Sequence, residues 1–414
     1  MRTTSRSVLR PLVLFVLVSA CASCSGGTTP ASDAAHDTNE VATSNQERLI
    51  LDHLARRVVM PTLRTMATDL AALEDATATL EADPSETNRT LARAAYVTAM
   101  DSVERAEVYQ IGPAAPVGST PEAAALRDEY YPWPLVNGCR IDQEMLTDAY
   151  TSDALLAAEA LNVRGLPTVE YLLWVPDTNN TCSPTTSINT DGTWAALGDD
   201  EVWARRAAYA HRAARLSRQA ADHLVATWEA GYLDRLVTAG AGSSTFPTAR
   251  AAINAVTDGL LYVYEPLLDE KLGVPAGLYT CPTAMCAENV ESTLRDRASD
   301  ADEEGGSLRA IRVNLEAFRA GYLGLEGELD GPGIDDLLDF VGASELDQRI
   351  QDALADAMEA VDAIEGPLVV AVIERNAQVV AAIDAIDALT TLLKTELVTI
   401  LDLELPMRAE GDND

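Results

Sequence analysis

Several residue types and motifs are scarce or missing from this chain of 414 residues, and each absence narrows its function. Lysine and arginine number 30 against 65 aspartates and glutamates, and the formal charge of −35 argues against binding to nucleic acid or, by charge, to anionic lipid. Such a surface is compatible with attracting cations, although a merely soluble surface has the same composition. Only four phenylalanines occur, which indicates an aliphatic core. No P-loop, G-x-G-x-x-G or G-x-S-x-G motif is present, so nothing indicates the enzyme classes built on them.

Long hydrophobic runs are also missing after the N-terminus. No later stretch reaches the roughly 20 apolar residues that a membrane-spanning helix needs. The apolar segment at residues 11–18 is itself too short for a stable span. Residues 1–20 have the composition of an export signal, whose positive end is formed by Arg2, Arg6 and Arg10.

The end of this segment resembles a bacterial lipobox. In the run Val18-Ser19-Ala20-Cys21, small residues precede a cysteine. The pattern predicts cleavage after Ala20 and lipid on Cys21, so that acyl chains attach the protein to an envelope membrane on its periplasmic face. Both the inner and the outer membrane are open as the place of the anchor. The alternative is an ordinary secretory signal that leaves Cys21 or Cys24 as a free thiol.

The segment after the cleavage site is rich in Ser, Thr, Ala, Gly and Asp. Residues 21–45 are therefore predicted to be a flexible tether, because this composition cannot bury a core. Cleavage would leave 394 residues (414 minus 20), and the loss of three arginines and no acids would change the formal charge from −35 to −38.

Four cysteines lie beyond the tether, at positions 139, 182, 281 and 286. An even number in an exported chain indicates disulfides. Cys281 and Cys286 are near enough in sequence to close a small loop, and Cys139 and Cys182 would then pair across a longer one. A metal site is weakly indicated, because no second C-x-x-C and no nearby histidine accompany either pair.

The hydrophobic periodicity is helical nearly throughout. A capping box at residues 44–47 predicts the start of a long helix, in which Pro61 should cause a kink. Its apolar stripe, spaced four, three, four and three, consists of Val59, Leu63, Met66, Leu70 and Leu73. Further helices are expected at residues 86–109, 141–162, 167–174, 200–236, 248–271, 306–321, 333–341, 344–363 and 366–403.

The distribution of these helices predicts an all-α fold with two helical-bundle domains packed side by side. The Gly- and Ser-rich segment at 239–244 is the best boundary. The domains would then be residues 46–238 and 245–406, and each is long enough to bury its own core.

One segment, Gly165-Leu166-Pro167-Thr168-Val169-Glu170-Tyr171-Leu172-Leu173-Trp174, resembles the signature of the imelysin family. That signature is G-x-H-x-x-E followed by Y-L-L-[FW], and Pro167 stands where the family carries His. Other stretches resemble the family in the same order, including residues 59–61, 109–113, 133–134 with 141–142, 291–292, 307–308, 314–318 and 322–324. The similarity covers most of residues 46–405.

The resemblance implies an all-α protein with two bundle-like domains and a site near their interface. Imelysin-like proteins are exported by bacteria, often as lipoproteins, and are linked to iron uptake. The family was named for a proposed metallopeptidase activity. By family analogy, a ligand-binding cleft would be lined by Glu170, Trp133, Glu291, Ser292 and Asn314. Without the resemblance, Ser292 would be interpreted as a helix cap and Asn314 as a buried polar residue.

The missing histidine weakens the case for a metal. His and Glu three residues apart on a helix share one face, but Glu170 alone is a weak ligand, because zinc and iron need three or four. A histidine from elsewhere would have to complete the site, and none lies in an H-x-x-E or H-E-x-x-H context. The candidates are His53, His211 and His223. Alternatively, Glu170 only stabilises the positive end of its helix.

The leading hypothesis is a non-enzymatic accessory or binding protein in envelope iron or metal acquisition. Iron or another divalent metal is the candidate cofactor, and an outer-membrane uptake protein is the candidate partner. The alternatives are a metal-dependent peptidase of the imelysin type and a degenerate family member that acts as a protein-interaction scaffold.

Overall fold

The computed structural model describes residues 31–281, 286–300 and 305–404. The expected signal at 1–20, the lipidation site Cys21 and the first part of the tether lie outside the described residues. The described residues from Ala42 onward belong to one compact unit. The described residues form helices and turns without a β-sheet, and only an isolated bridge joins Glu326 to Leu329. The expected all-α fold is confirmed.

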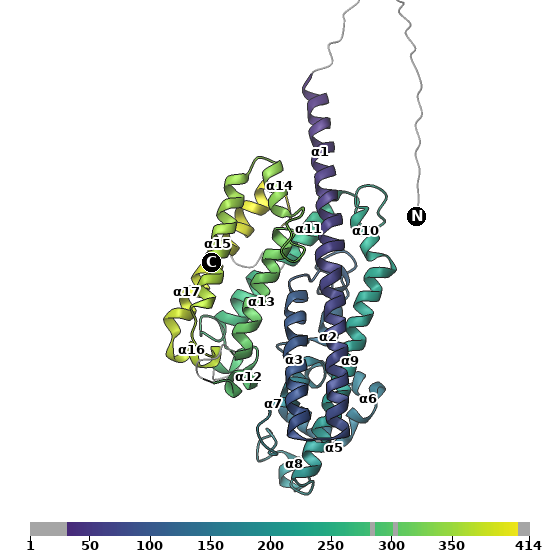
Figure 1. Ribbon diagram of the computed structural model, residues 1–414, viewed down its shortest axis with the longest axis vertical. Coiled ribbons are helices and arrows are strands. Elements are labelled where there is room, and N and C mark those ends of the chain that lie inside the picture. Colours follow the sequence, from purple (N-terminus) through teal and green to yellow (C-terminus); the bar gives the residue numbers. More distant parts are fainter. Residues whose placement is uncertain (1–30, 282–285, 301–304, 405–414) are drawn as a thin grey trace, which may run out of the picture. The chain divides into compact units, whose positions relative to one another are not determined.

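Three long helices pack side by side and position the rest of the N-terminal half (Figure 1). They are α2 (Met60–Ala82), α3 (Glu86–Glu107) and α9 (Asp199–Thr227). The apolar stripe expected in α2 is buried, and the facing side of α9 contributes small side chains that let the helix axes approach closely. The buried alanines of α9 are Ala207, Ala210, Ala213, Ala214 and Ala221.

The N-terminal helix begins earlier than expected. α1 covers Ala31–His53, so part of the segment assigned to the tether is helical and Ser44 is not a helix start. The Ser44 hydroxyl instead accepts a hydrogen bond from Arg48, at 3.1 Å. A π-helical segment, η1 (Leu54–Val59), then leads into α2. Pro61 lacks the N–H that a regular turn would use, so the wider turn just before it costs little.

The region between α3 and α9 is more broken than its periodicity suggested. The expected helix over 141–162 is wrong, because Asp148 adopts a left-handed conformation with φ of 59° and ends the helix there. Only α7 is continuous over its expected range. The elements are η2 (Gly112–Ala114), α4 (Leu126–Tyr130), α5 (Gly138–Thr147), η3 (Ala149–Thr151), α6 (Asp153–Ala157), η4 (Leu161–Val163), α7 (Leu166–Trp174) and α8 (Ser187–Thr190).

The C-terminal half is likewise helical, with irregular turns inside the longer expected helices. The α9 helix continues through η5 (Trp228–Tyr232), bent at Gly231, into α10 (Leu233–Val237). The remaining elements are α11 (Ala249–Leu260), η6 (Leu261–Val263), η7 (Tyr264–Gly273), η8 (Cys286–Asn289), α12 (Thr293–Ala298), α13 (Gly305–Tyr322), α14 (Ile334–Phe340), α15 (Ser344–Asp362), α16 (Leu368–Glu374), α17 (Asn376–Thr391), η9 (Leu392–Leu397) and α18 (Val398–Ile400).

Helix α13 joins the two halves, because it packs against α3 on one side and α15 on the other (Figure 1). A turn is present at the expected boundary near residues 239–244. The division into two bundle domains stays a prediction.

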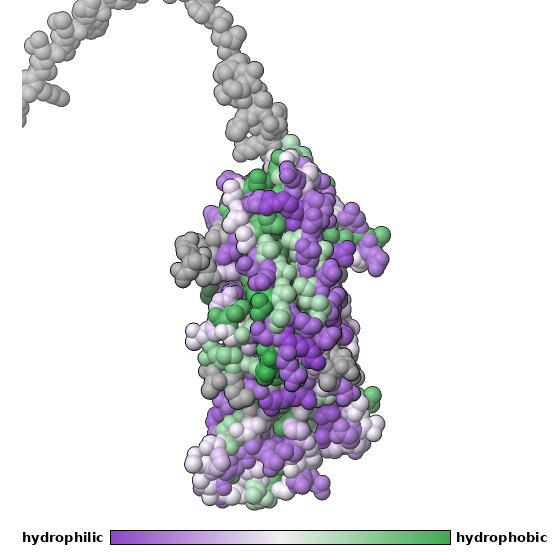
Figure 2. Space-filling view, turned by 90° about the vertical axis from the view of Figure 1, so that its left-hand side faces the viewer, coloured by the Kyte–Doolittle hydropathy of each residue, from purple (hydrophilic) through white to green (hydrophobic). Residues whose placement is uncertain are grey.

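The run Asn376–Ile400 is long and apolar enough to cross a membrane by length and composition, a property that core helices of soluble proteins share. Its apolar stripe is buried in the protein, and its exposed positions include Asp384, Asp387 and Thr391. On the face in Figure 2, hydrophobic residues are interspersed among hydrophilic ones. The run therefore behaves as an amphipathic core helix, and its buried positions are Val379, Ile383, Ile386, Leu389, Leu393 and Leu397.

Candidate functional site

The signature segment forms α7, and glycine is required where that helix begins. Gly165 has a φ of 78°, and a Cβ there would lie 2.5 Å from the ring of Pro132. Pro167 lies in the first turn, where its missing N–H costs little. The helix runs through the interior, and Glu170 is only 8% exposed.

One oxygen of the Glu170 carboxylate contacts three protein groups. Glu170 Oε2 accepts hydrogen bonds from the Tyr96 hydroxyl at 3.2 Å and the Ser292 hydroxyl at 3.1 Å. The guanidinium Nε of Arg295 lies 3.3 Å from the same oxygen. Burial raises the pKa of Glu170, and the positive charge of Arg295 opposes that rise. The carboxylate is thus neutralised by an arginine.

Arg295 comes from α12, a short helix that the sequence pattern did not predict. Its Nε also donates to the Ser292 hydroxyl at 3.1 Å, and its guanidinium lies 5.4 Å from the centre of the Tyr96 ring. A Cβ at position 306 would come within 2.6 Å of the Arg295 Nε, so Gly306 leaves the room that the guanidinium occupies. The surroundings of Glu170 are therefore shaped around an arginine.

A second group of polar residues is centred on Lys271, which is fully buried in η7. Its ammonium lies 2.6 Å from Glu104 Oε2, 2.9 Å from Asn314 Oδ1 and 2.9 Å from Glu291 Oε2. The contacts with Glu104 and Asn314 are hydrogen bonds, and the contact with Glu291 is an ion pair. Burial alone would lower the pKa of Lys271, but the two carboxylates outweigh burial and raise it.

Aromatic side chains enclose this lysine. The rings of Trp133 and Tyr262 both have their centres 5.7 Å from the Lys271 ammonium. The Tyr131 hydroxyl donates to Glu291, and the Tyr262 hydroxyl donates to Glu107. These contacts extend the group to Arg127, which pairs with Glu107. We call the whole set the buried polar network: Tyr96, Glu104, Glu107, Arg127, Tyr131, Trp133, Glu170, Tyr262, Lys271, Glu291, Ser292, Arg295 and Asn314.

The network contains all five residues predicted to line a cleft. Glu170 contacts Ser292, while Glu291 and Asn314 meet at Lys271 beside Trp133. Because Glu291 and Ser292 are adjacent in the chain, the two groups are continuous. The structure places these residues together; a role in ligand binding stays a prediction.

The sequence reasoning missed the cations and the inner carboxylates of the network. One signal was available for Lys271, since the chain has only two lysines and the other is Lys394. A lysine in a segment otherwise suited to the core is a candidate for a buried charge. Arg295 and Glu104 carried no comparable signal, because arginine and glutamate are common along the whole chain.

The histidines considered as partners for Glu170 lie elsewhere. His53 Nε2 is 2.8 Å from the Gly324 carbonyl oxygen, His211 pairs with Glu81, and His223 is exposed on α9. Among the residues described, no group of three His, Cys, Asp or Glu side chains is placed to hold a metal ion. The residues around Glu170 therefore do not fit a zinc or iron centre.

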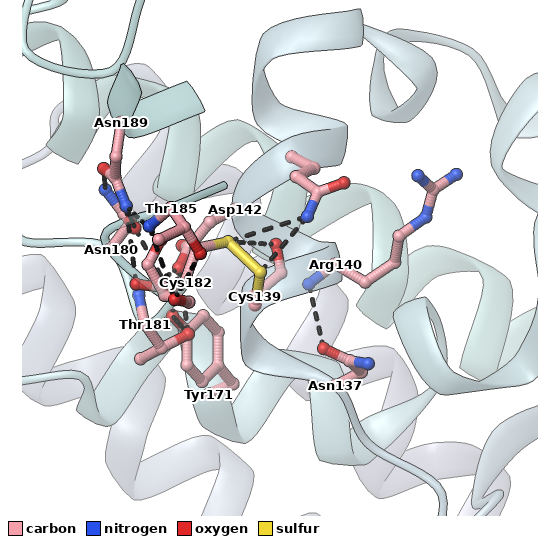
Figure 3. Close-up of a disulfide and its surroundings, with 12 residues drawn as sticks. Asn137, Cys139, Arg140, Asp142, Tyr171, Asn180, Thr181, Cys182, Thr185 and Asn189 are labelled. Carbon is pink, nitrogen blue, oxygen red and sulfur yellow. Dashed lines mark hydrogen bonds between the residues drawn. A yellow bond between two sulfur atoms is a disulfide. The ribbon is translucent and has the colours of Figure 1, made fainter. Parts of the chain in front are cut away.

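Both expected cysteine pairs are present as disulfides, with Cα–Cα distances of 4.4 Å for Cys139–Cys182 and 5.3 Å for Cys281–Cys286. The first ties α5 to the loop after α7 (Figure 3). Beside it, Asp142 Oδ2 accepts from the Tyr171 hydroxyl at 2.7 Å and from the Thr181 amide at 2.8 Å. These bonds fix the α7 residue next to Glu170.

A cavity of about 380 Å³ opens beside the Glu170 group. Arg295 lines it, so the network is reached from this side. The described residues that line it are Val97, Trp174, Arg295, Ala298, Ser299, Gly305, Gly306 and Arg309. A larger cavity of about 580 Å³ lies among α2, α3 and α13, but none of the five predicted residues lines it.

Comparisons with known proteins identify the family and the fold of this chain. The family model for imelysin (peptidase M75) matches residues 59–395. A crystal structure described as an iron-regulated protein A precursor, from Parabacteroides distasonis, has a TM-score of 0.67 at 16% identity, covering 86% of this chain and 94% of its own. An imelysin-like protein from Psychrobacter arcticum gives 0.64 at 15% identity, covering 88% and 98%. A search of curated proteins gives no match. The match over most of the chain shows that this protein belongs to the imelysin family.

Proposed function

We propose that this chain is a non-enzymatic binding protein that serves iron or other metal acquisition in the cell envelope. The observation that carries the proposal is the contact between Glu170 and Arg295, where the family signature would lead one to expect a metal. A metal ion at Glu170 would have to displace a guanidinium that is itself only 5% exposed. Breaking a buried ion pair costs about 3–5 kcal/mol, so the arrangement disfavours the peptidase alternative.

The cavity beside Arg295 favours a ligand that carries acceptor oxygens. A guanidinium binds carboxylates and similar groups through directed hydrogen bonds, and Trp174 supplies an aromatic wall. A volume of about 380 Å³ suits part of a small molecule. An iron chelator with carboxylates, or haem, has this chemistry. One structural neighbour is described as an iron-regulated protein, which supports the connection with iron.

The cellular setting is part of the same proposal. Lipid on Cys21 would hold the protein at the periplasmic face of an envelope membrane, where an outer-membrane uptake protein could pass the ligand on. We expect metabolic labelling with radioactive palmitate to mark the natural chain and to fail for Cys21→Ala. Labelling that persists in this variant would contradict the lipid anchor.

Metal analysis and a proteolysis assay separate binding from catalysis. A metallopeptidase needs a bound metal and a positioned water. The purified protein is expected to contain no stoichiometric zinc or iron and to leave casein intact, with or without a chelator. Stoichiometric metal together with chelator-sensitive cleavage would overturn the proposal.

Ligand binding is tested by thermal stability, because a molecule that binds only the folded state raises the melting temperature. Ferric citrate, haem and siderophores would be screened on the natural protein. The shift should disappear in Arg295→Leu, which removes the guanidinium that lines the cavity, and persist in Glu144→Gln, a buried glutamate of α5 that lies outside the network. No shift with any of these compounds would favour the protein-interaction scaffold instead.

A further inference from the structure

The buried polar network has one more negative charge than it has positive charges. Its cations are three in number, and each contacts a carboxylate of the network. Against them stand four carboxylates, since Lys271 alone faces two. The charged residues are Arg127, Lys271 and Arg295 on one side and Glu104, Glu107, Glu170 and Glu291 on the other. An uncompensated charge is costly in a region that water does not reach.

The excess is confined to one place. Arg127 pairs with Glu107, and Arg295 pairs with Glu170, so each of these pairs is balanced. The remaining members are one ammonium and two carboxylates, around Lys271.

Two carboxylate oxygens at this place have no hydrogen bond. Glu104 Oε1 is buried without a partner among the described residues. Glu291 Oε2 accepts no hydrogen bond from the described residues, although it forms an ion pair with Lys271. Two neighbouring carboxyl groups that contact one ammonium are an arrangement in which a proton can be shared.

We infer that Glu104 and Glu291 hold one proton between them at neutral pH, and that this proton keeps the Glu170–Ser292 contact assembled. The shared proton makes the group around Lys271 neutral and gives an unpartnered oxygen a hydrogen bond. Because both carboxyls contact the same ammonium, the proton is assigned to the pair and not to one residue. Burial and the charge of Glu291 raise the pKa of Glu104 to about 8, in agreement with this assignment.

Loss of the proton would act first on the segment that carries Ser292. Glu104 lies in a long helix, whereas Glu291 precedes α12 in an irregular stretch. Repulsion between the two carboxylates should therefore move Glu291, and with it the neighbouring Ser292 that contacts Glu170. The groups that face Glu104 from the elements around it are Lys271 of η7, Glu291 before α12, Asn314 of α13, Tyr130 and Tyr131 at the end of α4, and Tyr262 of η6.

Infrared spectroscopy detects the proton directly, without any ligand. The natural protein should show the carbonyl band of a buried carboxylic acid at pH 6, and this band should disappear with a midpoint near pH 8. The component that disappears near pH 8 should be absent from Glu104→Gln and unchanged in Glu144→Gln, whose buried carboxylate already pairs with Arg140 and Thr147. Asp335, whose pKa burial raises to about 7, should contribute a separate component in all three proteins. The titration of the natural protein decides the question even if a variant fails to fold.

Hydrogen exchange tests the consequence for the site. Peptides that cover residues 286–300 should exchange several-fold faster at pH 9 than their intrinsic rates explain, while peptides from α2 and α9 should not. In Glu104→Gln the segment should stay protected at both pH values. The effect on ligand binding rests on the proposed function, whereas both measurements use the ligand-free protein.

Three results would overturn the inference. One is the absence, in the natural protein, of a carboxylic-acid component that titrates near pH 8. Another is a stoichiometric small cation in native mass spectrometry that is lost in Glu104→Gln, because that cation would then neutralise the pair. The third is exchange of residues 286–300 that does not depend on pH.

Discussion

The two parts of the buried polar network neutralise their buried carboxylates in different ways. Around Glu170, one carboxylate meets one guanidinium, and two hydroxyls complete the contacts. Around Lys271, one ammonium meets two carboxylates and an amide. Around Glu170, the charges of the carboxylate and the guanidinium cancel. Around Lys271, the charges cancel only if one of the two carboxyl groups is protonated.

The comparison teaches that burial and charge balance have to be considered together. Burial raises the pKa of both Glu170 and Glu104. The arginine that contacts Glu170 opposes the rise, whereas for Glu104 the nearby Glu291 adds to it and takes the value to about 8. Two buried carboxylates therefore behave differently: Glu170 forms an ion pair with Arg295, whereas Glu104 titrates near neutrality.

The largest effect should come from removing the lysine. Lys271→Met leaves two buried carboxylates without a cation, and we expect it to lower the free energy of unfolding by about 4–5 kcal/mol, measured by urea denaturation. Lys394→Met is the matched control, because the only other lysine lies over the Tyr264 ring at 3.6 Å and should cost about 1 kcal/mol or less. Similar losses for both lysines would contradict the role given to Lys271.

Removing the arginine should cost somewhat less. Arg295→Leu leaves one buried carboxylate, Glu170, which can take up a proton, and we expect a loss of about 3 kcal/mol. Adding Glu170→Gln removes that carboxylate, so the double variant should be destabilised by less than the sum of the two single changes. Additive losses in the same denaturation experiment would mean that the two side chains do not interact.

A smaller effect on stability is expected from pH, and it should distinguish the residues around Lys271 from those around Glu170. A raised pKa in the folded state means that the stability Glu104 contributes is fully present below its ordinary value of 4.5 and is lost as the pH rises through about 8. Within that window the natural protein should lose up to about 1.4 kcal/mol per pH unit. Glu104→Gln should flatten this slope, whereas Glu144→Gln should retain it. The three proteins are compared by their melting temperatures between pH 5 and 9. Equal slopes for the natural protein and Glu104→Gln would contradict the proton assigned to Glu104 and Glu291.

The smallest expected effect concerns the missing signature residue. Pro167→His restores the family pattern, yet Arg295 still occupies the position beside Glu170. We expect no stoichiometric zinc or iron by elemental analysis and a change in stability of about 1 kcal/mol or less. Tight metal binding by this single variant would show that the proline, and not the arginine, excludes the metal.

Much of the fold could be predicted from local patterns. The stripes of α2 and α17 and the start of α7 at Gly165 followed from helical spacing and from glycine and proline chemistry. In the region between α3 and α9, a single residue accounts for one failure of the pattern. Asp148 in a left-handed conformation interrupts the helix expected over 141–162, and periodicity carries no information about such a residue.

Only part of the candidate site could be predicted from local sequence patterns. Glu170, Glu291 and Ser292 were found because they lie in segments that resemble the family. Arg295 was not found, because it lies on a six-residue helix without a strong apolar period. The pairing of a carboxylate with its counter-ion depends on which segments meet in space, and Arg295 is 125 residues away from Glu170 along the chain.

By itself, the sequence determined that this chain is helical, that its core contains little phenylalanine and that a histidine is missing from its signature. Those properties reside in neighbouring residues and in composition. Only the tertiary structure decided what replaces a metal at Glu170 and which carboxylates surround Lys271. Electrostatic energy depends on distance and burial, and packing sets both by bringing α3, α7, η7, α12 and α13 together.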